Sequence, residues 1–283
     1  MNIKDECIDR AIGCFIGLAI GDALGAPVEF KEPGEFEPVT DYRAGGAFRL
    51  EAGYWTDDTS MALCLADSII EHNDIVESDI ILRFCRWYRN GENSSTGRCF
   101  DIGNQTRKVL DTFMRTKEYH QAKNDFFLSG NGCIMRLAPV AVRWYNDEKI
   151  LIRMSRLQSM TTHGADICLD ACEELAILLG KAIRGENVID ELKEFAIARN
   201  NVVPNTGYVV DTMIAAKWAV GSTTNFEDAV LAAANLGGDA DTIAAVAGQI
   251  AGAIYGKSSI RHDWIDRLHE SNRLLKIATD LII

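Results

Sequence analysis

Residues 11–25, AIGCFIGLAIGDALG, decide the fold. The stretch is apolar or small on nearly every side, which is typical of a helix buried all round at the centre of a globular protein. Its glycines at positions 13, 17 and 21 recur at every fourth residue, a spacing that lets a second helix approach closely. Residues 243–256, IAAVAGQIAGAIYG, have the same character. We therefore expect two buried central helices.

Most of the remaining apolar residues follow a helical period. The expected helices cover residues 6–24, 58–72, 78–89, 104–115, 135–145, 148–160, 166–184, 188–199, 209–220, 226–235, 242–255 and 260–282. Residues 31–55 and 91–103 are rich in glycine and polar residues, and we expect long loops there, which are often functional. Only residues 38–50 alternate, and we interpret them as loop. The predicted fold is an all-α, compact many-helix bundle with one domain over residues 1–283.

Composition and charge exclude some classes of function. Apolar residues make up 47% of the 283 residues, enough for a sizeable core. The net charge of -12 makes nucleic acid an unexpected partner, because phosphate binding needs a basic face. The apolar run before Asp22 is expected to be too short to span a bilayer. No signal peptide is visible, so we expect a cytoplasmic monomer with reduced cysteines, in which Cys168 and Cys172 are small buried residues.

Two acidic clusters lie far apart in the chain. GYWTDDTSMALCL (53–65) contains Thr56-Asp57-Asp58-Thr59, and NLGGDADTIAAVAG (235–248) contains Asp239-Ala240-Asp241-Thr242. Carboxylate and hydroxyl oxygens suit Mg²⁺ or Mn²⁺. If the fold brings the clusters together, their four carboxylates need cations to neutralise them. Helix capping is the alternative, but it explains one aspartate of each cluster better than both. The sequence therefore indicates a site for one or two metal ions.

Three further segments carry weaker signals. Asp22 and Glu29 flank a glycine-rich turn, where Asp22 could cap backbone amides and Glu29 could bind a metal or lie in solvent. SGNGCIMRLAP (129–139) could present backbone N–H groups to a phosphate, and Arg136 could pair with a carboxylate or phosphate. Asp101, in TGRCFDIGNQT (96–106), is either a cap or a catalytic carboxylate.

Two aromatic side chains also precede helices. His163, in TTHGAD (161–166), is either a structural group or part of a site. Tyr208, in NTGYVVDT (205–212), could stack on a base or simply pack against its neighbours. Taken alone, neither residue indicates a function.

Seven blocks taken in order carry a resemblance. They are GCFIGLAIGDALGAPVEF (13–30), GYWTDDTSMALCLADSI (53–69), CFDIGNQT (99–106), GNGCIMRLAPVA (130–141), TTHGADICLDAC (161–172), GYVVDT (207–212) and NLGGDADTIAAVAGQIAGAIYG (235–256). Together they resemble the ADP-ribosylglycohydrolase family, above all its dinitrogenase reductase-activating, arginine-directed branch. The blocks cover nearly the whole chain, and no residue of the metal motifs departs from the family pattern.

The resemblance implies an all-α fold around two Mg²⁺ or Mn²⁺ ions and assigns roles to individual residues. The implied metal ligands are Thr56, Asp57, Asp58, Asp239, Asp241 and Thr242. Glu29 would lie at the metals, and Asp101 would do acid–base work, with Asp58 and Asp241 also serving catalysis. The implied substrate-binding residues are Gly130, Asn131 and Gly132 around the phosphates and distal ribose, His163 at the ribose and diphosphate, and Tyr208 near adenine.

The implied activity is metal-dependent hydrolysis of the N-glycosidic bond between ADP-ribose and a modified protein side chain, most naturally arginine. There are several alternatives. The substrate could be serine-linked ADP-ribose or a free ADP-ribosyl metabolite. The protein could instead be a two-metal phosphohydrolase acting on nucleotide diphosphates, a non-catalytic ADP-ribose binder or a crystallin-like structural protein. A role in immunity against an ADP-ribosylating toxin would have to be enzymatic, because the first helix is expected to begin within about the first six residues.

Overall fold

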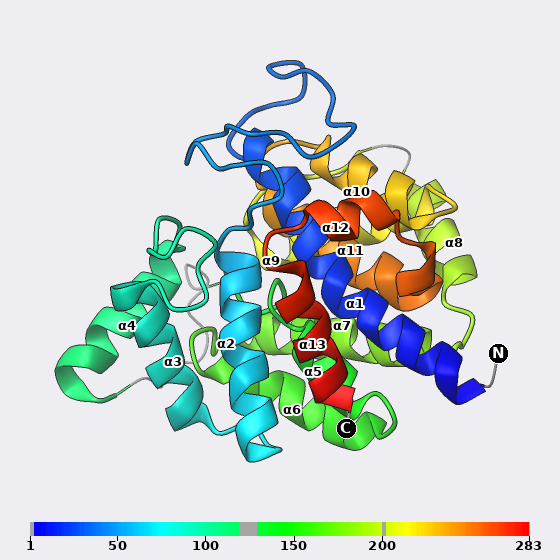
Figure 1. Ribbon diagram of the computed structural model, residues 1–283. Coiled ribbons are helices and arrows are strands. Elements are labelled where there is room, and N and C mark those ends of the chain that lie inside the picture. The colour runs from blue at the N-terminus through cyan, green and yellow to red at the C-terminus, as the bar shows by residue number, and fades with distance from the viewer. Residues whose placement is uncertain (1–2, 119–128, 200–201, 283) are drawn as a thin grey trace.

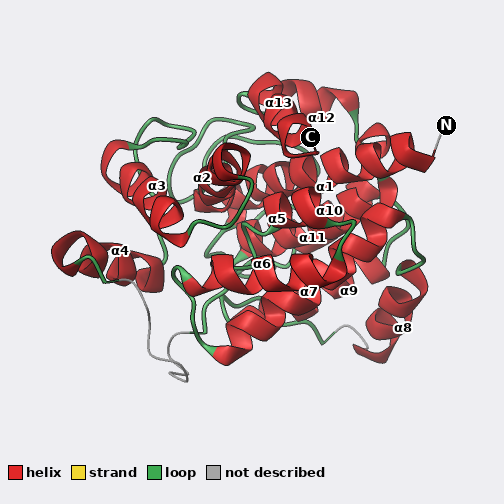
Figure 2. Ribbon diagram, turned by 90° about the horizontal axis from the view of Figure 1, so that it is seen from below, coloured by secondary structure: helices red, strands yellow, loops and turns green. Residues whose placement is uncertain are grey.

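A computed structural model describes residues 3–118, 129–199 and 202–282. Its helices surround a central pair and are joined by loops (Figures 1 and 2). They are α1 (Ile3–Gly25), η1 (Ala26–Val28), α2 (Asp57–His72), α3 (Glu77–Asn90), α4 (Asn104–Thr116), α5 (Ala138–Trp144), α6 (Glu148–Met160), α7 (Asp166–Arg184), α8 (Ile189–Arg199), α9 (Val209–Gly221), α10 (Phe226–Ala234), α11 (Ala240–Tyr255), η3 (Lys257–Ser259), α12 (His262–Arg267) and α13 (Ser271–Ile282). Within these residues β-pairing is limited to two isolated bridges, so the all-α prediction is confirmed.

The centre of the molecule is the antiparallel pair α1 and α11. A Cβ atom on Gly13 would lie 2.4 Å from the carbonyl oxygen of Gly252, and one on Gly17 would lie 2.2 Å from that of Gly248. At Gly21 the same atom would lie 2.0 Å from the carbonyl oxygen of Ala244. Because contact this close excludes any side chain, the four-residue glycine spacing fixes how the two backbones meet. The predicted close approach is confirmed.

The pair is enclosed by the other helices. Buried apolar side chains from Cys7 to Leu281 form one continuous cluster. By length and composition, the segment Lys4–Val28 could cross a membrane, so the expectation that this run is too short was wrong. In this fold 94% of its most apolar window is buried inside the protein, as in the core helix of a globular domain.

Two helix boundaries differ from the prediction. Residues 260–282 form two helices instead of one, because Glu270 adopts a left-handed φ of 48° and the backbone N–H of His269 donates to the carbonyl of Gly53 at 3.0 Å. The helix expected from residue 135 begins only at Ala138, with Pro139 in its first turn, where a proline is favoured. The other helix ends agree with the sequence prediction to within a few residues.

The predicted loops hold the surface next to the buried pair. Residues 29–55 leave α1 and arch over one end of the bundle before α2, and they contain a single bridge between Gly45 and Leu50 (Figure 1). The loop between α3 and α4 lies on the adjacent side (Figure 1). Both loops therefore border the end where α1 finishes and α11 begins.

Candidate functional site

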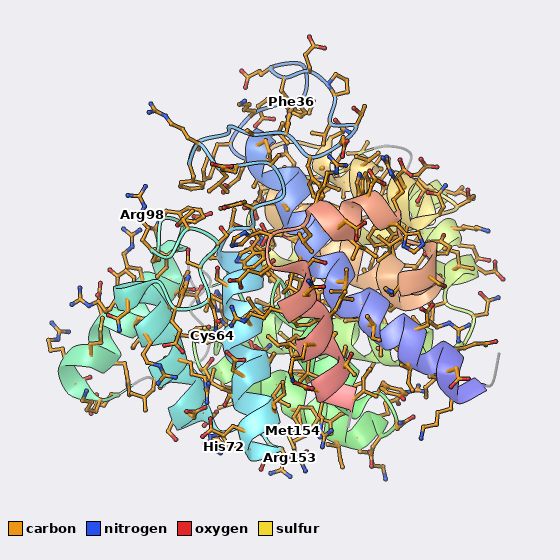
Figure 3. The ribbon with its side chains drawn as sticks, in the orientation of Figure 1. Phe36, Cys64, His72, Arg98, Arg153 and Met154 are labelled. Atoms are coloured by element: carbon orange, nitrogen blue, oxygen red, sulfur yellow. The ribbon has the colours of Figure 1, made fainter. Side chains whose placement is uncertain are left out.

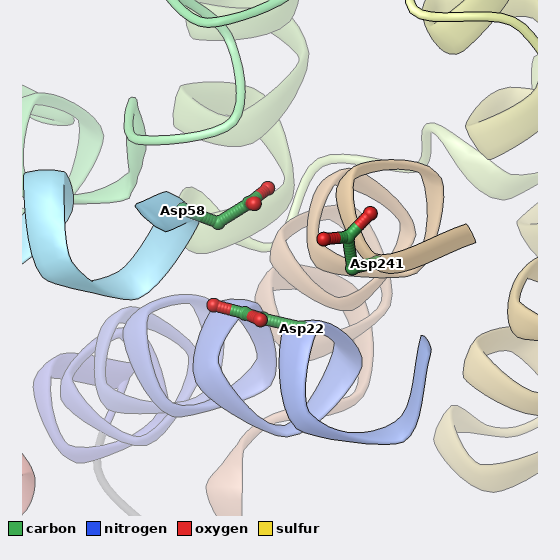
Figure 4. Close-up of side chains that lie close together, drawn as sticks. All are labelled: Asp22, Asp58 and Asp241. Carbon is green, nitrogen blue, oxygen red and sulfur yellow. The ribbon is translucent and has the colours of Figure 1, made fainter. Parts of the chain in front are cut away.

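The two acidic clusters meet where α1 ends and α2 and α11 begin. The hydroxyl oxygen of Thr56 lies 3.2 Å from Asp58 Oδ2 and 3.2 Å from Asp241 Oδ2. The Thr242 hydroxyl lies 3.4 Å from the same Asp58 oxygen. Asp22, Asp58 and Asp241 come from three different helices and direct their carboxylates into one small space (Figure 4). Oxygen donors more than 180 residues apart in the chain thus share one site.

Asp22 performs the capping role that the sequence left open. Its Oδ1 accepts hydrogen bonds from the backbone N–H and hydroxyl of Thr56, at 2.8 and 2.9 Å. Its Oδ2 accepts from the backbone N–H and hydroxyl of Thr59, at 3.0 and 2.6 Å. Both oxygens are therefore engaged, and Asp22 holds the first turn of α2 in place instead of offering a free lone pair. The sequence signal for this role is a charge inside an apolar helix.

A second group of carboxylates lies beside the first. Glu29, Asp239 and Asp241 each offer an oxygen within 4.8 Å of the others. Glu29 is buried, with 5% of its surface exposed, so the solvent-exposed alternative is excluded. Glu29 Oε2 and Asp58 Oδ1 are buried without a hydrogen-bond partner among the described residues. Orphaned carboxylate oxygens of this kind need a cation or water.

The electrostatics of this site favour a bound cation. Burial, followed by repulsion from neighbouring carboxylates, raises the pKa of Asp58, Asp241 and Glu29 well above the usual range. The same causes raise the pKa of Asp57 to about 7. Burial raises the pKa of Asp239 to about 6, against a hydrogen bond from Asn131. A hard divalent cation accepts such oxygen donors and restores their charged form, so the residues present fit Mg²⁺ or Mn²⁺.

A cleft of about 690 Å³ opens over the acidic site. This volume lies within the range of small-molecule sites. The sequence-predicted residues that line it are Glu29, Asp57, Asp101, Gly130, Asn131, Gly132, His163, Asp239, Asp241 and Thr242. Other lining residues, which sequence reasoning missed, include Phe30, Glu32, Gln105, Asn205 and Thr206. All of these except Glu32 lie within segments quoted from the sequence, but none was given a role there, because they lie in loops or at helix ends whose partners are distant in the chain.

Asp101 stands in the wall of the cleft next to the acidic cluster. Burial, with the nearby Asp57 and Asp241 carboxylates, raises the pKa of Asp101 to about 10. The side chain is therefore protonated at neutral pH in the absence of cations. A protonated carboxylic acid facing a cleft is able to donate a proton.

The glycine loop Gly130–Gly132 lies against both the acidic site and His163. The side-chain amide of Asn131 donates to Asp239 and, at 2.9 Å, to the hydroxyl of Thr212. A Cβ on Gly132 would lie only 2.8 Å from the ring of His163. Position 132 therefore requires glycine if the histidine ring is to face the loop.

Buried hydrogen bonds connect Arg136, Thr162 and His163. Arg136 is fully buried and donates at 2.8 Å to the hydroxyl of Thr162, which lies 2.8 Å from His163 Nδ1. The Thr162 oxygen accepts from Arg136 and keeps a second lone pair as well as its own proton, so its contact with Nδ1 fits either tautomer of the ring. Burial lowers the pKa of His163 to about 4. The ring is therefore neutral at neutral pH, and its Nε2 edge faces the glycine loop.

The expected pairing of Arg136 with a carboxylate or phosphate was wrong. Its guanidinium donates to the side chain and carbonyl of Gln158 and to Thr161 as well as Thr162, and it lies 4.6 Å from the ring centroid of Phe84. A fully buried side chain cannot reach a ligand in the cleft. Sequence reasoning missed its position because its oxygen partners lie in one turn more than 20 residues later in the chain.

Tyr208 lies beside the cleft instead of lining it in the described part of the chain. Its backbone forms an isolated bridge with Gly130, and it precedes the first residue of α9. The position of an adenine ring near Tyr208 stays a prediction. Cys168 and Cys172 are buried on α7, as the sequence predicts.

Comparison with known proteins agrees with this geometry. The family model described as ADP-ribosylglycohydrolase matches residues 3–283. The chain belongs to the ADP-ribosylglycohydrolase family. A solved structure described as an ADP-ribosylglycohydrolase-related protein complex is 38% identical, covers 98% of each chain and superposes with a TM-score of 0.85.

Curated relatives of this glycohydrolase chain carry more specific names. ADP-ribosylarginine hydrolase Tri1 of Pseudomonas putida is 42% identical over 98% of this chain and 79% of its own length. The protein of the same name from Serratia proteamaculans is 41% identical over 98% and 80%. The ADP-ribosyl-(dinitrogen reductase) glycohydrolase of Rhodospirillum rubrum is 32% identical over 92% and 90%.

Proposed function

We propose that this protein hydrolyses the N-glycosidic bond between ADP-ribose and a modified arginine side chain, and so reverses mono-ADP-ribosylation of a protein. The observation that carries the proposal is the meeting of Thr56 and Asp58 with Asp241 and Thr242, because Asp241 and Thr242 line a ligand-sized cleft. Relatives named as ADP-ribosylarginine hydrolases, at 41–42% identity over nearly the whole chain, support arginine as the linkage.

Two Mg²⁺ or Mn²⁺ ions per chain complete the proposal. The residues that would hold them are Thr56, Asp57, Asp58, Asp239, Asp241 and Thr242, with Glu29 beside them. When bound, the ions would supply Lewis-acid charge that orients the sugar hydroxyls and neutralises the carboxylates. Asp22 positions the candidate ligands on α2, because it accepts hydrogen bonds from the backbone of the first turn of this helix.

The chain's own residues provide the remaining chemistry. The reaction breaks the bond between the ribose C1″ atom and the guanidine nitrogen, and a water oxygen bonds to C1″ in its place. Positive charge that builds on the ribose is stabilised by nearby carboxylates, including Glu29. As the bond breaks, the guanidine nitrogen takes up a proton and the water gives one up, and Asp101, which lines the cleft, is placed to transfer it. The products are ADP-ribose and unmodified arginine.

The other side of the cleft suits the ADP-ribose. The N–H of Asn131 donates to the carbonyl of Gly207 at 3.1 Å and that of Gly130 to Gln105 Oε1 at 3.4 Å, so the backbone donor proposed for the diphosphate is the N–H of Gly132. The ring of His163 lines the cleft beside it and would bind the ribose. The ring of His163 stays neutral at any pH above about 4. The side-chain amide of Asn131 donates a hydrogen bond to Asp239, which fixes the distance between the glycine loop and the acidic side of the cleft.

Product identification tests the proposal. The purified protein is incubated with arginine-linked and with serine-linked ADP-ribosylated peptides, with Mg²⁺, with Mn²⁺ and with a chelator. We expect intact ADP-ribose from the arginine-linked peptide and no release under chelation. Release of AMP would indicate a phosphohydrolase, and a preference for the serine-linked peptide would overturn the arginine assignment. We further propose that the protein acts as a cytoplasmic monomer, which fractionation and light scattering would test.

A further inference from the structure

An exposed aromatic ring stands at the mouth of the cleft, directly after a buried carboxylate. Phe30 is 66% exposed and lines the cleft, whereas the preceding Glu29 is 5% exposed. Phe30 also has a φ of 64°, in the left-handed region that bulky residues rarely adopt. A large apolar side chain kept in solvent, in a disfavoured backbone conformation, indicates a binding role.

Backbone hydrogen bonds fix this ring relative to the acidic site. The N–H of Phe30 donates to the carbonyl of Gly238 at 2.7 Å, and the N–H of Gly238 donates to the carbonyl of Lys31 at 2.8 Å. Gly238 directly precedes Asp239, a candidate metal ligand. The position of Phe30 is therefore coupled to the residues around the reacting sugar, and the ring does not sit on a free loop.

Two more rings continue from Phe30, and neither is among the lining residues of the cleft. The centroids of Phe30 and Phe48 lie 6.2 Å apart with an edge-on angle of 73°, and those of Phe48 and Phe100 lie 5.2 Å apart. Phe100 directly precedes Asp101. The row of rings thus connects the chain neighbours of Glu29 and Asp101, the two carboxylates placed beside the bond that breaks. Edge-on support from Phe48 leaves a face of Phe30 available to a ligand.

The charge around this rim selects the kind of ligand. Glu29, Glu32 and Asp101 line the cleft, and none of its lining residues in the described part of the chain is lysine or arginine. Aromatic faces beside carboxylates are the combination that recognises a guanidinium, through stacking and charge together. The guanidinium of an ADP-ribosylated arginine stays cationic, and it is joined directly to the ribose carbon where the bond breaks.

We propose that Phe30, supported by Phe48, is the surface on which the guanidinium and alkyl chain of the modified arginine rest, and that it selects a cationic side chain over an uncharged one. This inference rests on the proposed function, because it concerns the same cleft. It makes Phe30 a determinant of substrate choice, while the ADP-ribose part of the substrate is bound by the opposite side of the cleft.

Substitution Phe30→Leu tests the inference, since leucine keeps an apolar side chain but removes the aromatic face. We expect KM for an arginine-linked ADP-ribosylated peptide to rise about tenfold, which equals about 1.4 kcal/mol. The Kd for free ADP-ribose, measured by titration calorimetry, should change by less than about twofold, because the product has no guanidinium. kcat should change little.

Phe36→Leu is the matched control. Phe36 lies in the same loop, above the end of α1 (Figure 3). The guanidinium carbon of Arg43 lies 5.9 Å from the centroid of its ring. It is not among the lining residues of the cleft, so its removal should leave KM unchanged. Thermal melting of both variants checks that the loop stays folded.

Two outcomes would overturn the inference. An equal rise in KM and in the Kd for ADP-ribose would place the ring on the adenine or sugar, and unchanged values would mean that the ring contacts no part of the substrate. If the wild-type protein does not release ADP-ribose at all, the proposed function fails. The Kd of the uncleaved peptide, compared between wild type and Phe30→Leu, then still decides whether the ring binds the guanidinium.

Discussion

The helices α1 and α11 are packed in two different ways along their length. In the middle, at Gly17 and Gly248, the two backbones touch and leave no room for a side chain. At the end, beyond Gly21, the same helices carry Asp22 and Asp241 into a cluster of carboxylates. There, the neighbouring Asp58 and Glu29 each bury an oxygen with no partner among the described residues.

The contrast separates stability from function. The contact between the glycines needs no bound ligand. It fixes the distance between α1 and α11, whose carboxylates come from opposite ends of the sequence. The acidic end is incomplete without cations, since it gathers buried negative charge and raises the pKa of each member. Changes in the first region should therefore destroy the fold, whereas changes in the second should destroy activity and spare the fold.

The largest effect is expected for Gly248→Val. A Cβ at this position would lie 2.0 Å from the carbonyl oxygen of Gly17, which only a separation of the two central helices could relieve. Overpacking usually costs about 1–3 kcal/mol, and a clash with the facing backbone at the centre should exceed that range. We expect no cooperative unfolding transition by circular dichroism.

Gly103→Ala is the control for that experiment. A Cβ atom on Gly103 would have no neighbour within 4 Å, and the residue has an ordinary φ of -59°, so alanine should fit. The melting temperature of this variant should stay close to that of the wild type. A normal melting curve for Gly248→Val would mean that α1 and α11 are not in contact in solution.

Asp241→Asn should abolish turnover while leaving the protein folded. We expect kcat to fall by more than about a thousandfold, because the change removes a carboxylate from the cation site. The rise in melting temperature on adding Mg²⁺ or Mn²⁺ should disappear, since a ligand stabilises only a state that binds it. In chelator the variant should be at least as stable as the wild type, because one buried acid is gone.

Asp170→Asn provides the comparison for the acidic end. Its side chain is 72% exposed and pairs with Arg156 far from the cleft. Turnover and the metal-dependent rise in melting temperature should both be unchanged. Substantial activity of Asp241→Asn under chelation would contradict the assignment of Asp241 to a cation site.

Asp101→Asn should have a smaller effect on the same chemistry. Asp101 is the cleft-lining carboxyl proposed to transfer the proton, and asparagine has the same shape but no acidic proton. We expect kcat to fall by about a hundredfold, the usual contribution of a general acid. The Kd for ADP-ribose should change by less than about threefold. Asp111→Asn, an exposed substitution on α4, is the control.

Equal losses of turnover and of ADP-ribose affinity would show that Asp101 only shapes the cleft. The comparison needs both measurements on the same preparation, because a partly unfolded variant would lose both together.

The central helix contact could be predicted because its signal is local. Gly13, Gly17 and Gly21 recur once per helical turn, and such a period can be seen without knowing the partner. The break between α12 and α13 could not be predicted in this way. It depends on a hydrogen bond from His269 to Gly53, residues that only the folded chain brings together.

The acidic clusters could be predicted for the same reason, since each lies within four consecutive residues. The supporting contacts could not. Asp22 finds its partners 34 and 37 residues away, and Arg136 reaches Thr162 across 26 residues. Phe30 ends one of the quoted blocks, but its exposure and backbone conformation exist only in the fold. Candidate ligands that are neighbours in the chain can thus be predicted from the sequence, whereas the distant residues that orient them cannot.

An effect of a different kind, on the pH dependence of stability, is expected at His163, which lines the cleft. Its pKa of about 4 in the folded protein lies below the unfolded value of about 6.5, so the unfolded chain binds more protons between these pH values. The free energy of unfolding should therefore fall as the pH drops from 6.5 to 4 and level off below that. Over this window His163 should account for a loss of about 3 kcal/mol.

His163→Asn should remove this part of the pH dependence. The groups that face the ring, Cys133 and Arg136, are unchanged in the variant, and the carboxylates of the acidic site titrate equally in both proteins. The difference in free energy of unfolding between wild type and variant, measured with urea at steps between pH 4 and 7.5, should thus shift steadily in favour of the variant at low pH. Parallel curves would mean that burial does not hold His163 neutral in the folded protein.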